Sequence, residues 1–270
     1  MTTERNRLII AGPCAAESRN QVVECANAMK ERGIEIMRAS LWKPRTKPGF
    51  EGVGSEGIAW LSEVTNLGVT VGTEVMLPEH VSSMADGIAA NNGDPTKVFL
   101  WLGSRNQNHV IQREIARRTL GEMPDNVRLL IKNQPWSDEK HWSGIVDHVT
   151  GAGIDPGRVI LCHRGFSPNG TTNPDNFRNL PDFNMAMRVR EKTGLPMLFD
   201  PSHIGGSVDN VFKVVKAAAD YDFDGIMVEV HPEPPNAQTD TGQQLTLKEL
   251  DQLLLSWRNG LHKTERFPFR

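Results

Sequence analysis

The feature that most constrains the fold of this chain is an alternation, repeated eight times, between short apolar runs and longer amphipathic segments. The runs are rich in β-branched and aliphatic residues, as buried parallel strands are, and the longer segments have the helical period. We expect strands at Arg7–Ala11, Ile34–Arg38, Val69–Thr73, Val98–Leu102, Val127–Lys132, Arg158–Cys162, Pro196–Phe199 and Gly225–Val230.

The amphipathic segments predict crossover helices. They span Arg19–Arg32, Glu56–Asn66, Pro78–Ala90, His109–Leu120, Asp138–Ala152, Asp182–Lys192, Val208–Asp220 and Leu247 to about Leu261. Four strands follow glycines that suit helix C-termini, namely Gly33, Gly68, Gly153 and Gly194. Eight βα units in about 250 residues predict an α/β fold of the (β/α)8 TIM-barrel type. A doubly wound open sheet is the alternative, but no glycine-rich dinucleotide motif follows the first strand.

Length and composition are those of an ordinary globular protein. The chain has 270 residues and no low-complexity linker, so we expect one barrel domain over 1–270, with 246–270 as its final helix and tail. A net charge of −3 argues against a nucleic-acid partner, and no apolar run approaches the length of a membrane span. Because there is no signal-peptide pattern and the three cysteines are widely spaced, we expect a reducing, cytoplasmic location.

A basic loop follows the second predicted strand. From Trp42 to Gly52, three cations stand among two prolines and two glycines. Proline and glycine can hold such a loop in one shape, while Arg and Lys supply donors that bind phosphate or carboxylate. Taken alone, the loop is slightly better explained as a solvated basic surface. It becomes a candidate anion site because the other unusual residues of the chain also stand at the ends of predicted strands.

Those residues stand at the C-terminal ends of the predicted strands, where the active sites of such barrels lie. They are Cys14, Arg38, Glu74, Arg105, Lys132, Arg164, the Asp200-Pro201-Ser202-His203 turn and Glu229. Successive members are about one βα unit apart. We therefore expect their side chains to meet at one mouth of the barrel.

One part of this set has the chemistry of a metal site. A thiolate, an imidazole and two carboxylates suit zinc or a divalent transition metal, and they come from Cys14, His203, Glu229 and Asp240. Their spacing forms no recognised metal-binding pair, and each residue alone is explained by packing or capping. His231 follows Glu229 by two residues, so in a strand the two side chains point to the same side. His231 is therefore a competing metal ligand or a residue that contacts a metal ligand. We interpret Cys25 and Cys162 as packing residues.

The other part is cationic and comprises Arg38, Lys43, Arg45, Arg105, Lys132 and Arg164. So many positive charges in one mouth repel one another unless anions occupy it, and two phosphorylated substrates would supply those anions. Cations at strand ends with their heads in water would explain one or two of these residues, but not six.

Six motifs stand in order along the chain. They are Ala11-Gly12-Pro13-Cys14-Ala15-Ala16-Glu17-Ser18, Lys43-Pro44-Arg45-Thr46, Gly103-Ser104-Arg105-Asn106, Arg164-Gly165, Asp200-Pro201-Ser202-His203, and Val228-Glu229-Val230-His231-Pro232 with Asp240 and Gln243-Gln244. Together they resemble the short 3-deoxy-7-phosphoheptulonate (DAHP) synthases. The related 3-deoxy-manno-octulosonate 8-phosphate synthases share much of the pattern, but Pro44 and Thr46 favour the heptulosonate family. His163 and the continuation Lys47-Pro48-Gly49-Phe50 resemble the subgroup often fused to a chorismate mutase.

The resemblance implies a transferase that condenses phosphoenolpyruvate with erythrose 4-phosphate, the entry to the shikimate pathway and aromatic amino acid biosynthesis. It implies a divalent Mn, Fe, Zn or Co ion on Cys14, His203, Glu229 and Asp240. It implies a phosphoenolpyruvate site at Arg38, Arg105, Lys132 and Arg164, an erythrose 4-phosphate loop at Lys43-Pro44-Arg45-Thr46, and Asp200 among the substrate contacts. Either Lys43 or a water on the metal would protonate the forming alkoxide.

Two other functions stay open at this point. One is an octulosonate synthase that uses arabinose 5-phosphate, and the other is a phosphosugar-binding regulatory barrel, whose ligand set would be broken. All four ligand positions are intact. We expect a homo-oligomer, dimer or tetramer, with a chorismate mutase domain or partner as a further option. Because only a helix and a tail follow Asp240, we expect this polypeptide alone to be insensitive to aromatic amino acids, and to prephenate without a mutase.

Overall fold

The computed structural model describes residues 7–43 and 49–260, and in this part of the chain eight parallel strands close into a barrel in the order β1-β2-β3-β4-β5-β6-β7-β8. The strands are β1 (Leu8–Gly12), β2 (Ile36–Arg38), β3 (Thr70–Glu74), β4 (Val98–Leu102), β5 (Arg128–Lys132), β6 (Val159–His163), β7 (Met197–Phe199) and β8 (Gly225–Glu229). β8 pairs with β1 from Gly225 opposite Leu8 to Glu229 opposite Gly12, which closes the sheet. The predicted (β/α)8 barrel is confirmed.

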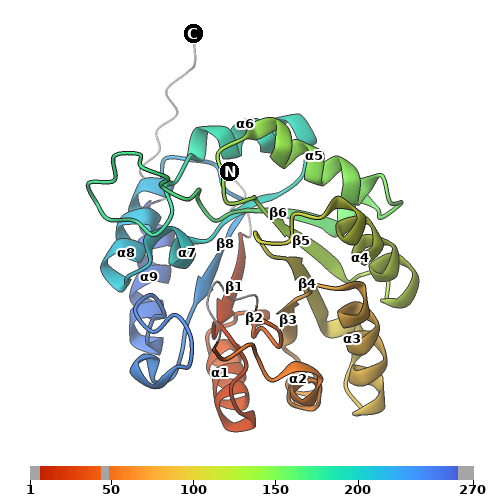
Figure 1. Cartoon of the computed structure of the whole chain (residues 1–270). Helices are drawn as coiled ribbons and strands as arrows, with labels where there is room; N and C mark the ends of the chain where they lie inside the picture. The colour runs from red at the N-terminus through yellow and green to blue at the C-terminus, as the bar shows by residue number, and fades with distance from the viewer. Residues whose placement is uncertain (1–6, 44–48, 261–270) are drawn as a thin grey trace, which may run out of the picture.

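Helices surround the strands as an outer ring (Figure 1). In the described part of the chain they are α1 (Arg19–Glu31), α2 (Ile58–Asn66), α3 (Pro78–Ala90), α4 (His109–Glu122), α5 (Glu139–Thr150), α6 (Phe183–Thr193), α7 (Pro201–Gly205), α8 (Val208–Ala218) and α9 (Leu247–Gly260). A 3-10 turn, Gly54–Gly57, leads into α2 where the sequence predicts an α-helix. Among these helices, none has both the length and the apolar character that crossing a bilayer requires.

Helix α7 differs from the prediction, because the sequence indicates only a turn after β7. The Asp200 side chain caps the segment by accepting a hydrogen bond from the His203 backbone N at 3.0 Å, and Pro201 occupies the first helical turn. Gly206 ends the helix with a φ of 75°. Five residues are too few for a hydrophobic period to show. The four glycines predicted to end helices all have positive φ, as expected.

The barrel interior changes character along the strands. Side chains of strands alternate between the interior and the helix layer. Below the C-terminal mouth, in what we call the lower half of the interior, lies one apolar cluster. It is formed by Ile10, Ile36, Phe99, Trp101, Leu130, Ile160, Cys162, Leu198 and Met227. Four buried ionisable residues lie two positions after a member of this cluster, at the end of a strand or directly after it: Arg38, Lys132, Asp200 and Glu229. The strand period therefore brings ionisable side chains together at the C-terminal mouth, which we call the upper half of the interior. Cys25 and Cys162 pack in the apolar layers, as predicted.

Candidate functional site

Cys14 reaches the mouth through a turn that requires glycine. Gly12 ends β1 with a φ of 143°, and a Cβ there would lie 2.4 Å from the Arg38 backbone O. The Cys14 backbone N donates to Gln244 Oε1 at 2.9 Å. Its sulfur lies 2.9 Å from Lys43 Nζ and donates to Asp240 Oδ2 at 3.1 Å. The first strand and the segment after the last strand thus meet at this thiol.

Three of the four predicted metal ligands form a compact group. Ligand atoms of Cys14, Glu229 and Asp240 all lie within 4.8 Å of one another. His203 stands at the margin of this group, with Nε2 3.7 Å from Glu229 Oε1 and Nδ1 2.8 Å from Asp200 Oδ2. His231 is directed elsewhere, since its Nε2 lies 3.7 Å from Glu17 Oε2. The structure therefore does not place this competing candidate in the group.

The protonation states of the group suit a divalent cation. Burial and the charge of Glu229 raise the pKa of Cys14, so the sulfur is a thiol that a metal would deprotonate. Burial lowers the pKa of His203 against the opposing pull of Asp200, which leaves a neutral imidazole. The buried Glu229 Oε1 makes no hydrogen bond within the described residues, although Arg38 Nη2 lies 2.9 Å away. One thiol, one imidazole and two carboxylates fit zinc or a transition metal.

Two buried cations line the floor of the mouth. Arg38 is 1% exposed, and its Nε and Nη2 donate hydrogen bonds to the Pro13 and Cys14 carbonyls, respectively, each at 3.2 Å. Its Nη1 is buried and finds no hydrogen-bond acceptor in the part of the chain that is described. Lys132 Nζ lies 2.6 Å from Asp200 Oδ2. Although burial raises the pKa of Asp200, His203 and Lys132 lower it well below its usual range. The Arg38 donor is thus available to an anionic ligand.

The remaining cations lie nearer the surface of the mouth. Burial lowers the pKa of Lys43, but Cys14 and Glu229 raise it more, so the ammonium keeps its proton. Burial and the neighbouring charges of Arg178 and Arg105 lower the pKa of Arg164 to about 10, against Asp200. This mutual repulsion favours bound anions. The structure therefore groups Arg38, Lys43, Arg105, Lys132 and Arg164, while Pro44, Arg45 and Thr46 lie outside the described residues.

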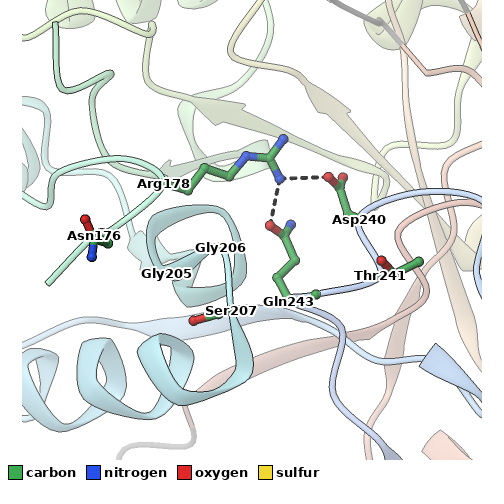
Figure 2. Close-up of a pocket in the computed structure, with 9 residues that line it drawn as sticks. Asn176, Arg178, Gly205, Gly206, Ser207, Asp240, Thr241 and Gln243 are labelled. Carbon is green, nitrogen blue, oxygen red and sulfur yellow. Dashed lines mark hydrogen bonds and ion pairs between the residues drawn. The ribbon is translucent and has the colours of Figure 1, made fainter. Parts of the chain in front are cut away.

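The structure adds a residue that strand-end patterns do not reveal. Arg178 lies in the irregular segment between β6 and α6, and its Nη1 donates to Asp240 Oδ1 at 2.8 Å and Gln243 Oε1 at 2.7 Å (Figure 2). These three residues line a cavity of about 390 Å³ that also borders Gly205 and Ser207. No hydrophobic period marks this segment. The nearby sequence signals are the motif residues Asp240 and Gln243, which both contact Arg178.

The family can now be assigned from the whole chain. The sequence model of the DAHP synthetase I family matches residues 2–264. The chain belongs to this family. The phospho-2-dehydro-3-deoxyheptonate aldolase of Thermotoga maritima is 30% identical over 253 residues, which are 91% of this chain and 67% of that protein. The 2-dehydro-3-deoxyphosphooctonate aldolase of Caulobacter vibrioides is 27% identical over 266 residues, which cover 91% of this chain and 84% of that protein.

Solved structures of family members share the fold. The crystal structure of the Thermotoga maritima DAHP synthase matches with a TM-score of 0.79 at 29% identity, over 94% of this chain and 68% of that one. A truncated form of the same enzyme gives a TM-score of 0.76 at 27% identity, over 94% and 86% of the two chains. This member of the DAHP synthetase I family therefore shares the barrel fold of the Thermotoga maritima DAHP synthase.

His163 is one of the residues by which the sequence resembles the subgroup often fused to a chorismate mutase. It lies on the outward face of β6, fully buried, and its ring stacks on Trp142 at a centroid distance of 5.6 Å. Its Nε2 accepts a hydrogen bond from the Asp182 backbone N at 3.0 Å. Burial and the charge of Arg164 lower the pKa of His163 to about 3. In this DAHP synthetase family member His163 is a neutral packing residue between β6 and α6.

Proposed function

We propose that this protein condenses phosphoenolpyruvate with erythrose 4-phosphate and water to give 3-deoxy-D-arabino-heptulosonate 7-phosphate and phosphate. The observation that carries the proposal is the juxtaposition, at one barrel mouth, of a compact thiol-carboxylate group with buried cations. Such a mouth suits two phosphorylated molecules and a metal ion. Family membership and the heptonate name of the Thermotoga maritima relative support it.

A divalent metal ion would be held by Cys14, His203, Glu229 and Asp240. When bound, it would supply a Lewis acid that polarises or orients the aldehyde. The neutral imidazole of His203 and the ionised carboxylates are in the states that metal coordination requires.

The buried cations would hold phosphoenolpyruvate. Arg38 offers the buried Nη1 donor, and Lys132, Arg164 and Arg105 add charge that balances carboxylate and phosphate. The substrate contact that the sequence predicts for Asp200 stays a prediction. Its oxygens also accept from Lys132 Nζ and contact the ring and backbone N of His203. We therefore propose that Asp200 orients those two residues as well.

In the reaction, carbon 3 of the enolpyruvate forms a bond to the aldehyde carbon. The aldehyde oxygen becomes an alkoxide, and Lys43, which keeps its ammonium proton in this site, would donate that proton. Water then adds at carbon 2 and phosphate leaves from it. Pro44, Arg45 and Thr46 would bind the phosphate of the aldose, which puts the second substrate beside Lys43.

Phosphate release from phosphoenolpyruvate tests the proposal. Purified protein is assayed with erythrose 4-phosphate and with arabinose 5-phosphate, each with and without a chelator. We expect faster release with erythrose 4-phosphate, loss on chelation and recovery with added divalent metal. Faster release with arabinose 5-phosphate would instead assign the octulosonate activity that the Caulobacter vibrioides relative is named for. Release with neither aldose would leave a phosphosugar-binding barrel.

The working form that we propose is a cytoplasmic homo-oligomer, with a chorismate mutase as domain or partner. Sedimentation of the purified chain, alone and with a mutase, tests the assembly. Assays with prephenate and with each aromatic amino acid test whether regulation depends on that partner.

A further inference from the structure

A chain of hydrogen bonds supports the metal-ligand group from its outer side. Arg178 Nη1 donates to both Asp240 Oδ1 and Gln243 Oε1, as the dashed lines in Figure 2 show. Gln243 Nε2 then donates to Glu229 Oε2 at 2.6 Å. One guanidinium therefore contacts one carboxylate of the group directly and the other through a single amide.

The two oxygens of each carboxylate, in Asp240 and in Glu229, contact different residues. Asp240 gives Oδ1 to Arg178 and turns Oδ2 toward the Cys14 sulfur at 3.1 Å. Glu229 Oε2 accepts from Gln243, while Oε1 lies 2.9 Å from Arg38 Nη2 and 3.7 Å from His203 Nε2. In both residues, the outer hydrogen bond engages one oxygen and leaves the other on the side of Cys14 or His203.

Asp240 needs such support because its backbone is strained. Its φ is 51°, in the left-handed region that residues other than glycine seldom adopt. A residue in that conformation keeps one geometry only when its surroundings over-determine it. Arg178 supplies part of that constraint with a charge-assisted hydrogen bond.

The residue after Arg178 extends the support to the other side of the mouth. Asn179 Nδ2 donates to the His203 carbonyl at 2.6 Å, and its Oδ1 accepts from Arg164 Nη1 at 3.1 Å. Gly206 allows this segment to approach α7, since a Cβ there would lie 2.6 Å from Arg178 Cβ. The segment before α6 thus contacts residues of both the ligand group and the anion site.

We infer that Arg178 is a positioning residue of the metal site, which fixes the Asp240 and Glu229 carboxylates in the orientation that binds a divalent ion. The inference rests on the proposed function, because it assumes that these carboxylates are ligands. Groups that orient metal ligands from outside typically change metal affinity by about 10- to 100-fold when they are removed. The positive charge of Arg178 by itself would act the other way and repel the ion.

Cobalt titration separates orientation from charge. Co²⁺ is added to chelator-treated protein, and the thiolate-to-cobalt absorption and the ligand-field bands are followed. We expect Arg178→Gln to bind Co²⁺ about 10- to 100-fold more weakly than the wild type, with altered ligand-field bands. Equal or tighter binding would overturn the inference, because the guanidinium would then act only as a repelling charge.

Two further variants complete the experiment. Arg178→Lys keeps the charge but not the planar fork, so we expect weakened binding there as well. It also serves if Arg178→Gln fails to fold, although a side chain 36% exposed should tolerate replacement. Arg188→Gln is the matched control, since Arg188 pairs only with the exposed Glu139 at 2.8 Å among the contacts described for it. It should bind Co²⁺ as the wild type does.

The outcomes also distinguish this inference from the proposed function. If the wild-type protein binds no Co²⁺ through a thiolate, the proposed metal site fails and the inference fails with it. If the wild type binds but both Arg178 variants match it in affinity and spectrum, only the inference fails. Thermal midpoints measured in chelator should stay close to the wild-type value, because the expected defect is in ligand orientation.

Discussion

The lower and upper halves of the barrel interior are built on the same strands but have opposite energetics. In the lower half, side chains such as Ile10, Ile160 and Met227 pack against one another, and each buried aliphatic side chain contributes about 1.5–3 kcal/mol. In the upper half, Arg38 and Glu229 form a buried ion pair, as do Lys132 and Asp200. Removing such ions from water costs several kcal/mol each, which pairing only partly offsets.

The difference indicates that the two halves of the barrel interior serve different purposes. Apolar residues in the lower half stabilise the barrel, and the ionisable residues two positions further on are tolerated for their chemistry. Changes in the upper half should therefore affect turnover most, and changes in the lower half should affect stability most.

The largest expected effect comes from the upper half. Cys14→Ser should lower turnover by roughly 10³-fold or more, because a Lewis acid supplies several kcal/mol of transition-state stabilisation and the thiolate anchors it. Initial rates of phosphate release measure the change, with the thermal midpoint as the control for folding. A chelator-treated wild type that kept full activity would show that the thiol serves no metal.

The complementary test is in the lower half. Ile160→Ala should reduce the free energy of unfolding by about 2–5 kcal/mol, because a buried aliphatic side chain is replaced by a cavity. Urea denaturation measures the loss. Turnover per folded molecule should be unchanged, and a turnover defect as large as that of Cys14→Ser would erase the distinction between the two halves.

His163 sharpens the comparison because it is an ionisable group in an apolar layer. Its folded-state pKa of about 3 lies below the usual 6.5, so the unfolded chain binds a proton first as pH falls. Stability should therefore fall by about 1 kcal/mol between pH 6.5 and 5.5, approaching about 1.4 kcal/mol per unit below that. His163→Gln keeps an acceptor for Asp182 and should flatten the dependence. If the stability of both proteins fell equally with pH, His163 would not be the group responsible.

The smallest effect is expected in the loop beyond both halves. Arg45→Ala should raise the KM for erythrose 4-phosphate about 10-fold, the size of one lost charge-assisted hydrogen bond, and leave the KM for phosphoenolpyruvate unchanged. Steady-state kinetics with each substrate varied in turn measure both constants. Lys47→Ala, in the same loop, is the control. Equal increases in the two constants would remove the assignment of Arg45 to the aldose.

The strand-end residues could be predicted because two simple periods fix them. Apolar runs locate the strands, and the alternation of side chains then places Arg38, Lys132 and Glu229 inside the barrel at one end. Their convergence follows from closure of the sheet. Predictions that depend on the loop 44–48, on the number of domains and on the bound metal stay predictions.

Pairings between distant loops could not be predicted. Arg178 and Asp240, for example, are 62 positions apart. No periodic pattern links such positions, because their approach depends on how irregular segments dock over the barrel mouth. The sequence predicts a substrate contact at Asp200, and the structure adds that its two oxygens also accept from Lys132 and from the His203 backbone N.

The contact between the Cys14 sulfur and Asp240 joins positions 226 residues apart, one before the first helix and one after the last strand. A ribosome adding roughly 5–20 residues per second needs about 10–45 s to synthesise the chain between them. During that time the thiol has left the ribosome without its carboxylate partners. An ion held by this group, as proposed, could therefore bind only after the final strand has closed the barrel.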